Sequence, residues 1–268
     1  MANATPAKLN GDTPVPNVAV DRSLRILEAF LGDKTDLGVL ELSRLLGLDK
    51  SVVHRVLLTM VGRGFLEQDP NTRRYRVGLR SWELGRRYRV GEPIKLIAER
   101  EIEAMVARYP YSTGFTSEFS DGDMIILTCF MGPGPMNVSI TPGIRLMAET
   151  TTTGKVWLAH LDPSEAEQII MQRRKAYTGT PLPALTTLMA ELADIRERGY
   201  EAAQGAFTPS IATVATVVRD PSGTLALGLS VDYLLSDQTV GLGAALPPDL
   251  LACARAIERA ATASPPVE

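Results

Sequence analysis

The chain has few of the residues on which several protein functions depend. Its 268 residues include only two cysteines and two histidines. Two cysteines cannot build a disulfide framework, which favours a cytoplasmic protein, and Cys129 and Cys253 are interpreted as small core residues. His54 and His160 have no partners at metal-ligand or catalytic-triad spacing. The sequence therefore predicts no metal, no cofactor and no enzymatic activity.

Long apolar runs are missing as well. No run approaches the roughly 18 apolar residues that would span a bilayer, which predicts that no membrane is involved. The first residues are rich in proline and do not pair a charged start with an apolar core. Residues 1–18 are therefore interpreted as a disordered arm, not as a signal peptide.

Charge is unevenly distributed along the chain, whose net charge is −3. Residues 21–91 hold fourteen Lys and Arg against nine Asp and Glu, a net of +5, whereas residues 92–268 hold thirteen against twenty-one, a net of −8. A basic front half joined to an acidic back half suggests that only the front half meets a polyanion such as DNA. Taken alone, the basic excess is explained equally well as ordinary surface charge.

Residues 39–60 predict two short helices joined by a tight turn. Gly47 supplies the positive φ that ends the first helix, and Asp49 supplies a side-chain cap for the second. The side chains that the pattern turns inward are Leu40, Leu45 and Leu46, followed by Val53, Val56, Leu57 and Met60. Ser51 and Arg55 fall on the opposite side of the second helix. This arrangement is that of a helix-turn-helix reading head.

The segments on either side extend this motif. Residues 21–31 predict a helix that precedes it, with Leu24, Leu27, Phe30 and Leu31 on the inward side. Residues 65–67 and 75–77 predict two strands joined by the turn Asp69-Pro70-Asn71. Three helices followed by a hairpin form a winged helix-turn-helix domain.

This domain presents three groups of candidate DNA contacts. The major-groove candidates are Lys50, Ser51, Val52, His54 and Arg55, of which Arg55 is best suited to bidentate contact with guanine. The wing carries Arg73, Arg74 and Arg76, which are placed for phosphate or a minor groove. Arg22 and Ser23 add phosphate contacts, although a simple N-cap explains Ser23 equally well. A solvated surface hairpin is the alternative for the wing.

The rest of the chain predicts a connecting helix and a second domain. Residues 79–90 and 94–109 predict helices separated by a break at Gly91-Glu92-Pro93. Strands are expected at 113–119, 124–130, 136–140, 211–219 and 224–231, and helices at 152–161, 163–174, 185–198 and 248–261. Strands in hairpins with helices between them indicate an α+β fold, with a mainly antiparallel sheet covered by helices on one face.

Several blocks together resemble the IclR family of bacterial transcription regulators. They are RSLRILEAF, ELSRLLGLDKSVVHRVLLTM, GFLEQDPNTRRYRVG, LRSWELGR, DGDMIIL, PGIRLMAETTTTGKVWLA and IRERGYEAAQGAFTPSIATVATVVRDPSGTLALGLSV, spread over roughly residues 21–260. The resemblance implies a winged helix-turn-helix domain at 19–80, a linker helix at 81–93 and an effector-binding domain at 94–264. It also implies dimers, or dimers of dimers, that bind palindromic operator DNA and respond to a small organic effector.

The family's effector motifs carry over only in part. Thr151, Thr152, Thr153 and Gly154 lie at a helix start, where amide groups can hold an anion. In the late motif, Ala203 stands where the family pattern has Asp or Ser, Ala206 where it has Glu, and Thr213 where it has Cys, Ser or Ala; Glu149 replaces a frequent His. These departures predict a roomier, less acidic pocket, suited to a larger or more apolar ligand such as an aromatic acid.

The sequence therefore predicts a ligand-responsive repressor. The alternative is a DNA-binding regulator whose C-terminal domain has lost ligand response and serves only oligomerisation. A rival of another class is an enzyme that uses the C-terminal domain for catalysis, which the lack of a catalytic cluster disfavours.

Overall fold

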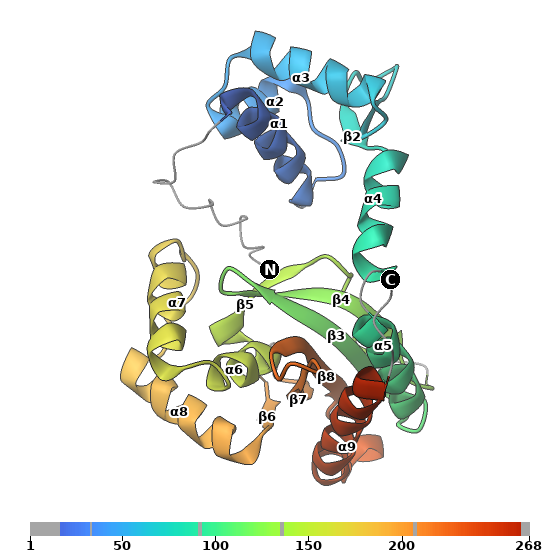
Figure 1. Cartoon of the computed structure of the whole chain (residues 1–268), viewed down its shortest axis with the longest axis vertical. Coiled ribbons are helices and arrows are strands. Elements are labelled where there is room, and N and C mark those ends of the chain that lie inside the picture. The colour runs from blue at the N-terminus through green and yellow to red at the C-terminus, as the bar shows by residue number, and fades with distance from the viewer. Residues whose placement is uncertain (1–16, 33, 91–92, 135–136, 206–207, 264–268) are drawn as a thin grey trace. The chain divides into compact units, whose positions relative to one another are not determined.

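The computed structural model describes residues 17–32, 34–90, 93–134, 137–205 and 208–263 (Figure 1). The chain divides into two compact units, residues 1–91 and 92–268. Within the described ranges, no helix is both long and apolar enough to cross a membrane. Most of the expected arm, up to residue 16, lies outside the described residues, and Val18 already begins a helix.

The first unit has three helices, a hairpin and a fourth helix (Figure 1). Its elements are α1 (Val18–Glu28), η1 (Ala29–Leu31), α2 (Val39–Leu46), α3 (Lys50–Gly62), β1 (Leu66–Gln68), β2 (Tyr75–Val77) and α4 (Leu79–Val90). β1 and β2 pair antiparallel, and Leu37 also pairs with Tyr75. This order confirms the predicted winged helix-turn-helix fold.

Packing in this unit confirms the inward face of α3 and only part of the inward face predicted for α1. Val53, Leu57 and Met60 are buried, as their spacing predicts. In α1, however, Leu24 is 53% exposed and Leu31, just beyond it, is 69% exposed, whereas Ile26 and Phe30 are buried. Leu27 is partly buried and packs against the same core, so the predicted inward side is correct at Leu27 and Phe30 and wrong at Leu24 and Leu31. In α2, similarly, Leu42 is buried, and Leu40 and Leu45 are exposed.

The second unit is built on one six-stranded antiparallel sheet, in the order β5-β4-β3-β8-β7-β6. The strands are β3 (Ser112–Ser120), β4 (Asp123–Met131), β5 (Arg145–Met147), β6 (Glu201–Gln204), β7 (Ile211–Arg219) and β8 (Leu225–Leu234). The helices are α5 (Pro93–Val106), α6 (Thr152–Ala159), α7 (Pro163–Lys175), α8 (Leu185–Arg198) and α9 (Leu242–Ala263), with η2 (Ala148–Thr150) and η3 (Asp237–Thr239). The predicted α+β class is confirmed.

Helices cover both faces of this sheet, not one as the sequence suggested (Figure 1). Successive side chains of a strand point to opposite faces. On β7, Val214 and Val218 pack with α5 and α9, whereas Ala215 and Val217 pack with α6, α7 and α8. On β8, Leu229 and Val231 also pack with α5 and α9. Gly228, Ser230 and Asp232 therefore face the side of α6.

Several elements of the second unit differ from the prediction. Residues 137–140 form no strand, and residues 135–136 of that expected strand lie outside the described residues. The edge strand next to β4 is instead β5. The short strand β6, which pairs with β7, was not predicted. α9 begins at Leu242 and contains Pro247 and Pro248, whereas the prolines suggested a start at residue 248.

The start of α6 depends on a glycine. A Cβ at Gly154 would lie 2.2 Å from the carbonyl oxygen of Ala148 and 2.4 Å from its Cα. Only glycine lets α6 approach η2 this closely, so Gly154 is required by the packing of the protein backbone.

We therefore expect Gly154→Ala to destabilise the second unit by about 1–3 kcal/mol, the usual cost of overpacking. Urea denaturation, followed through the fluorescence of Trp157 on α6 in a Trp82→Phe background, measures this change. Gly62→Ala is the matched control, because an added methyl group there meets no atom within 4 Å. Equal midpoints for Gly154→Ala and the wild type would contradict the close-contact argument.

Candidate DNA-reading surface and effector cavity

α3 presents a polar face on the side opposite its buried face. Lys50, Ser51, His54 and Arg55 are exposed, and Val52 is partly buried. Gly47 ends α2 with φ of 64°, as predicted. Asp49 occupies the N-cap position of α3, but within the described first unit its carboxylate makes no capping hydrogen bond. Its carbonyl oxygen instead accepts from the amides of Val52 and Val53, at 3.0 Å each.

The candidates on α1 lie next to α3. Arg22, Ser23, Val52 and Arg55 line one shallow groove, together with Ala19, Val56, Thr59, Met60, Arg63 and Phe65. The Ser23 hydroxyl donates to the carbonyl oxygen of Ala19 at 2.8 Å, and Asn17 is the N-cap residue of α1, so Ser23 is not the cap. The fold thus brings Arg22, Arg55 and Arg63 to one groove. Sequence reasoning missed Arg63, which follows the last residue of α3.

The tip of the wing is shaped by local hydrogen bonds. The Asp69 carboxylate accepts from the amides of Asn71 and Thr72 at 2.7 and 2.9 Å, and these bonds lower the pKa of Asp69. Arg73 follows with φ of 59° and is exposed. Its position suits contact with a phosphate group.

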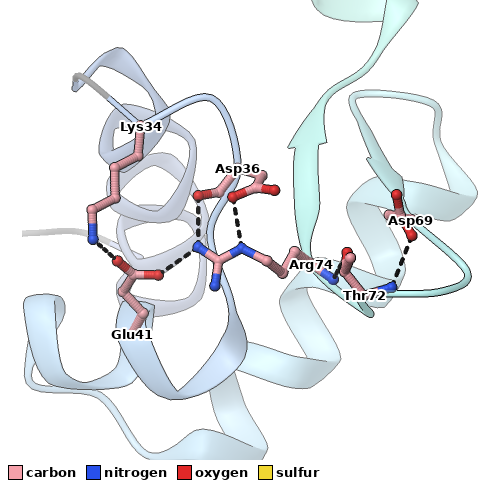
Figure 2. Close-up of polar contacts among 6 residues, drawn as sticks. All are labelled: Lys34, Asp36, Glu41, Asp69, Thr72 and Arg74. Carbon is pink, nitrogen blue, oxygen red and sulfur yellow. Dashed lines mark hydrogen bonds and ion pairs between the residues drawn. The ribbon is translucent and has the colours of Figure 1, made fainter.

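Arg74 points away from the tip, toward α2 (Figure 2). Its Nε donates to Asp36 Oδ1 at 2.6 Å and its Nη2 to Glu41 Oε2 at 2.9 Å. Lys34 also pairs with Glu41. The hydrogen bonds from Lys34, which has the larger effect, and from Arg74 lower the pKa of Glu41 to about 2. Arg74 therefore ties the wing to α2, which differs from the expected phosphate contact.

Arg76 is paired within the hairpin. Its Nη2 and Nε lie 2.9 and 3.1 Å from Glu67 Oε2 on the facing strand, and its side chain remains 62% exposed. Contact between Arg76 and phosphate would compete with this surface ion pair, which is worth at most about 1 kcal/mol. Of the three wing arginines, Arg73 has the least competition from neighbouring carboxylates in the described part of the chain.

The second unit contains a half-open cavity between the sheet and α6. Its lining includes the expected residues Thr151, Thr152, Thr153 and Thr213, with Thr150, Phe115, Ser117, Met124, Ile126, Ile140, Leu146, Ser230 and Asp232. The free space within it is about 50 Å³. Gly154 and Ala203, also expected at the site, are not in the lining. Ala206 lies outside the described residues.

The threonine run places backbone donors at one end of the cavity. The hydroxyl of Thr151, the N-cap of α6, accepts from the amide of Gly154 at 3.0 Å. The amides of Thr152 and Thr153, in the first turn of α6, have no acceptor within the helix. They are therefore available to a negatively charged ligand group, with help from the helix dipole.

The register of the strands places several polar side chains next to one another on the face of the sheet that lines the cavity. Thr113, Asp232, Thr213 and Ala203 are successive partners across β3, β8, β7 and β6. Asp232 is only 7% exposed, and Thr213 donates a hydrogen bond to it. Burial raises the pKa of Asp232 to about 7. A carboxyl group that sequence reasoning missed therefore lines the cavity.

The metal-binding and nucleophilic side chains of the described residues can be compared with the requirements of a metal or catalytic site. No three His, Cys, Asp or Glu side chains among them gather at a possible metal site. His160 Nδ1 lies 2.8 Å from the carbonyl oxygen of Val156, and burial lowers the pKa of His160. Burial raises the pKa of Cys253 to about 12, so this thiol stays protonated.

A winged helix-turn-helix unit followed along the chain by an α+β unit is the arrangement of a DNA-binding transcription regulator. Residues 19–70 match the model of the IclR helix-turn-helix domain, and residues 119–259, more than half of the chain, match that of the bacterial transcriptional regulator IclR C-terminal domain. The chain belongs to the IclR family. It is accordingly a transcriptional regulator that binds DNA and not an enzyme.

Individual relatives agree with this assignment. HTH-type transcriptional regulator BhcR of Paracoccus denitrificans is 29% identical over 224 residues, which cover 80% of this chain and 76% of that protein. Transcriptional repressor IclR of Escherichia coli is 22% identical over a region that covers 84% of this chain and 85% of that protein. The crystal structure of an IclR homologue from Microbacterium hydrocarbonoxydans, complexed with 4-hydroxybenzoate, is similar with a TM-score of 0.76, 25% identity and coverage of 92% of this chain and 100% of that one.

The roles of Arg73 and Arg74 in DNA binding can be distinguished by the salt dependence of the binding affinity. We expect Arg73→Ala to weaken binding to a non-specific duplex and to reduce the slope of log K against log salt by about 0.9, the value for one lost phosphate contact. Arg74→Ala should weaken binding with little change in that slope, because its guanidinium group is occupied by Asp36 and Glu41. Fluorescence anisotropy between 50 and 200 mM salt measures both slopes. Equal loss of slope in the two variants would show that Arg74 also contacts phosphate.

Proposed function

We propose that the protein is a repressor that binds a palindromic operator as a homodimer, or as a dimer of dimers, and releases it when a small organic acid enters the cavity of the second unit. The observation that carries this proposal is the pairing of two features in one chain. One is the exposed polar face of α3, and the other is a partly enclosed cavity whose threonine run offers amide donors. Such a protein acts where the chromosome is, in the cytoplasm.

Exposed apolar side chains on two helices support the dimer. On α4, Leu79, Trp82, Leu84 and Tyr88 are between 52% and 64% exposed. In α1, Val20 and Leu24 are similarly exposed. Large apolar side chains that are exposed to this extent are candidates for an interaction surface. A second copy of the chain is the partner that a palindromic site requires, because operator symmetry mirrors the two-fold symmetry of the protein.

The dimer also supplies a route for ligand control. Two reading helices must sit about 34 Å apart, one turn of DNA, to occupy both half-sites. α4 joins the DNA-binding unit to the second unit, so a ligand that changes the pairing of the second units would change the spacing of the helices. Small rotations are enough to lose one half-site.

An aromatic acid is the proposed class of effector. The cavity combines apolar walls, formed by Phe115, Met124, Ile126 and Leu146, with the amide donors of Thr152 and Thr153. The Microbacterium homologue was crystallised with an acid of this class, 4-hydroxybenzoate. The repressor role is supported by the name of the Escherichia coli relative.

Operator reading is tested at Arg55. We expect Arg55→Ala to lose about 1–3 kcal/mol of discrimination against a changed guanine, because a bidentate contact to that base is removed. The operator is first selected from random duplexes with the wild-type protein, and affinities are then compared by gel shift. Arg255→Ala, which removes the same charge from an exposed position on α9, should bind as the wild type does. Unchanged sequence preference in Arg55→Ala would remove this residue from the reading surface.

Effector binding is tested by thermal unfolding of the full chain with benzoate and hydroxybenzoates. A ligand at 100 times its dissociation constant should stabilise the binding unit by about 2.7 kcal/mol, because it binds only the folded state. The same acid should release the operator in a gel shift. No stabilisation by any organic acid would instead favour a second unit that serves only oligomerisation.

A further inference from the structure

The cavity contains a carboxyl group with no cation near it. Asp232 lies on the α6 side of β8, and no Lys, Arg or His is among the described residues that line the cavity. Thr213 on β7 is its hydrogen-bond donor. A second polar group nearby is unused: Thr113, its partner on β3, is fully buried, and the Thr113 hydroxyl makes no hydrogen bond with the described residues.

The charged side chains of the surrounding elements are engaged elsewhere. Those on β3, β4, β5, η2, α6 and β7 are Glu118, Asp123, Arg145, Glu149, Lys155 and Arg219. Their partners are, in the same order, Lys95, Arg173, Asp123, Arg174, Glu191 and the carbonyl oxygen of Gly223. Asp232 is the one charged residue of β8, and none of the six lines the cavity. Asp232 therefore faces the ligand space without a competing ion pair.

A buried carboxyl group without a cation lowers the stability of the folded protein. Its presence in a cavity therefore suggests a role in binding. In this cavity it can receive a hydrogen bond from a bound molecule. We propose that Asp232 determines effector specificity by selecting an acid that also carries a hydroxyl group, whose hydrogen is donated to the Asp232 carboxyl group. This inference rests on the proposed effector class, and it adds a requirement that the class alone does not contain.

A hydroxyl group fits the surroundings better than an ammonium group. The remaining walls are largely apolar, and a second full charge on the ligand would have to be stripped of water there. A neutral hydroxyl needs one acceptor only, which Asp232 supplies. The Thr113 and Ser230 hydroxyls lie at the same end of the sheet face and complete a polar patch.

The selection has a pH signature with a defined sign. Because burial raises the pKa of Asp232 to about 7, this group is largely neutral at pH 6 and largely charged at pH 8. A hydroxyl donor binds a charged carboxylate more strongly than a neutral carboxyl. A methyl ether in the same place donates nothing and leaves that charge buried and unpaired. Preference for the hydroxyl compound should therefore grow as the pH rises.

The test compares 3- and 4-hydroxybenzoate with their methyl ethers on the full chain by calorimetry at pH 6 and pH 8. The ligand carboxylates are charged at both values, and the phenols stay largely neutral. We expect the ratio of dissociation constants, ether over hydroxyl compound, to rise about tenfold between pH 6 and pH 8 in the wild type. In Asp232→Asn this ratio should not change with pH. Asp194→Asn, at an exposed position on α8, should behave as the wild type does.

The possible results distinguish a failure of the role proposed for Asp232 from a failure of the proposed effector class. A wild-type ratio that is the same at both pH values, or one that still changes in Asp232→Asn, overturns the role of Asp232 while leaving the effector class intact. If none of the acids binds the wild type, the effector class is wrong and this inference fails with it. Thermal unfolding at pH 8 checks the variant itself: Asp232→Asn should be at least as stable as the wild type, because the wild-type carboxylate is charged and buried there.

Discussion

The burial of one side of α3 is the constraint on which the DNA-binding function depends. Val53, Leu57 and Met60 are fixed in the core of the first unit with Ile26 and Leu42. Once these side chains are buried, the helix cannot rotate, and the residues half a turn away must face solvent. The groove shared with α1 then follows, because α1 packs against the same core. The direction of the polar face of α3 is thus fixed by packing and not by its own charge.

Charge plays two different roles in the wing. Arg74 is bound by Asp36 and Glu41, two carboxylates from a distant part of the chain, and so its charge holds the hairpin in place. Arg73, one residue earlier, has a left-handed backbone that directs the chain around the turn and leaves its side chain outward. Sequence position makes these neighbours look equivalent. Their different roles arise because residues 36 and 41 reach one of them and not the other.

The sequence predicted the elements better than their faces. Helix α8 was placed with its observed bounds, and the hairpin of β7 and β8 closely, because a strong period and a turn signal mark both. The predicted inward sides of α1 and α2 are correct at Leu27, Phe30 and Leu46 and wrong at the other predicted leucines, because apolar residues that face solvent can share the period of those that face the core. β6 escaped notice, since four residues are too few to show alternation. The match to the IclR models confirms the class that the quoted blocks suggested.

The cavity shows why part of a site lies beyond sequence reasoning. The threonine run was found because a helix start with small polar residues is visible along the chain. Asp232 was missed because the predicted strand ends at residue 231, one residue before it, whereas β8 continues to Leu234. Only the pairing of β8 with β3 and β7 places it on the α6 side, beside Thr213. Sheet register thus places residues 113, 213 and 232 side by side, a neighbourhood that no spacing along the chain reveals.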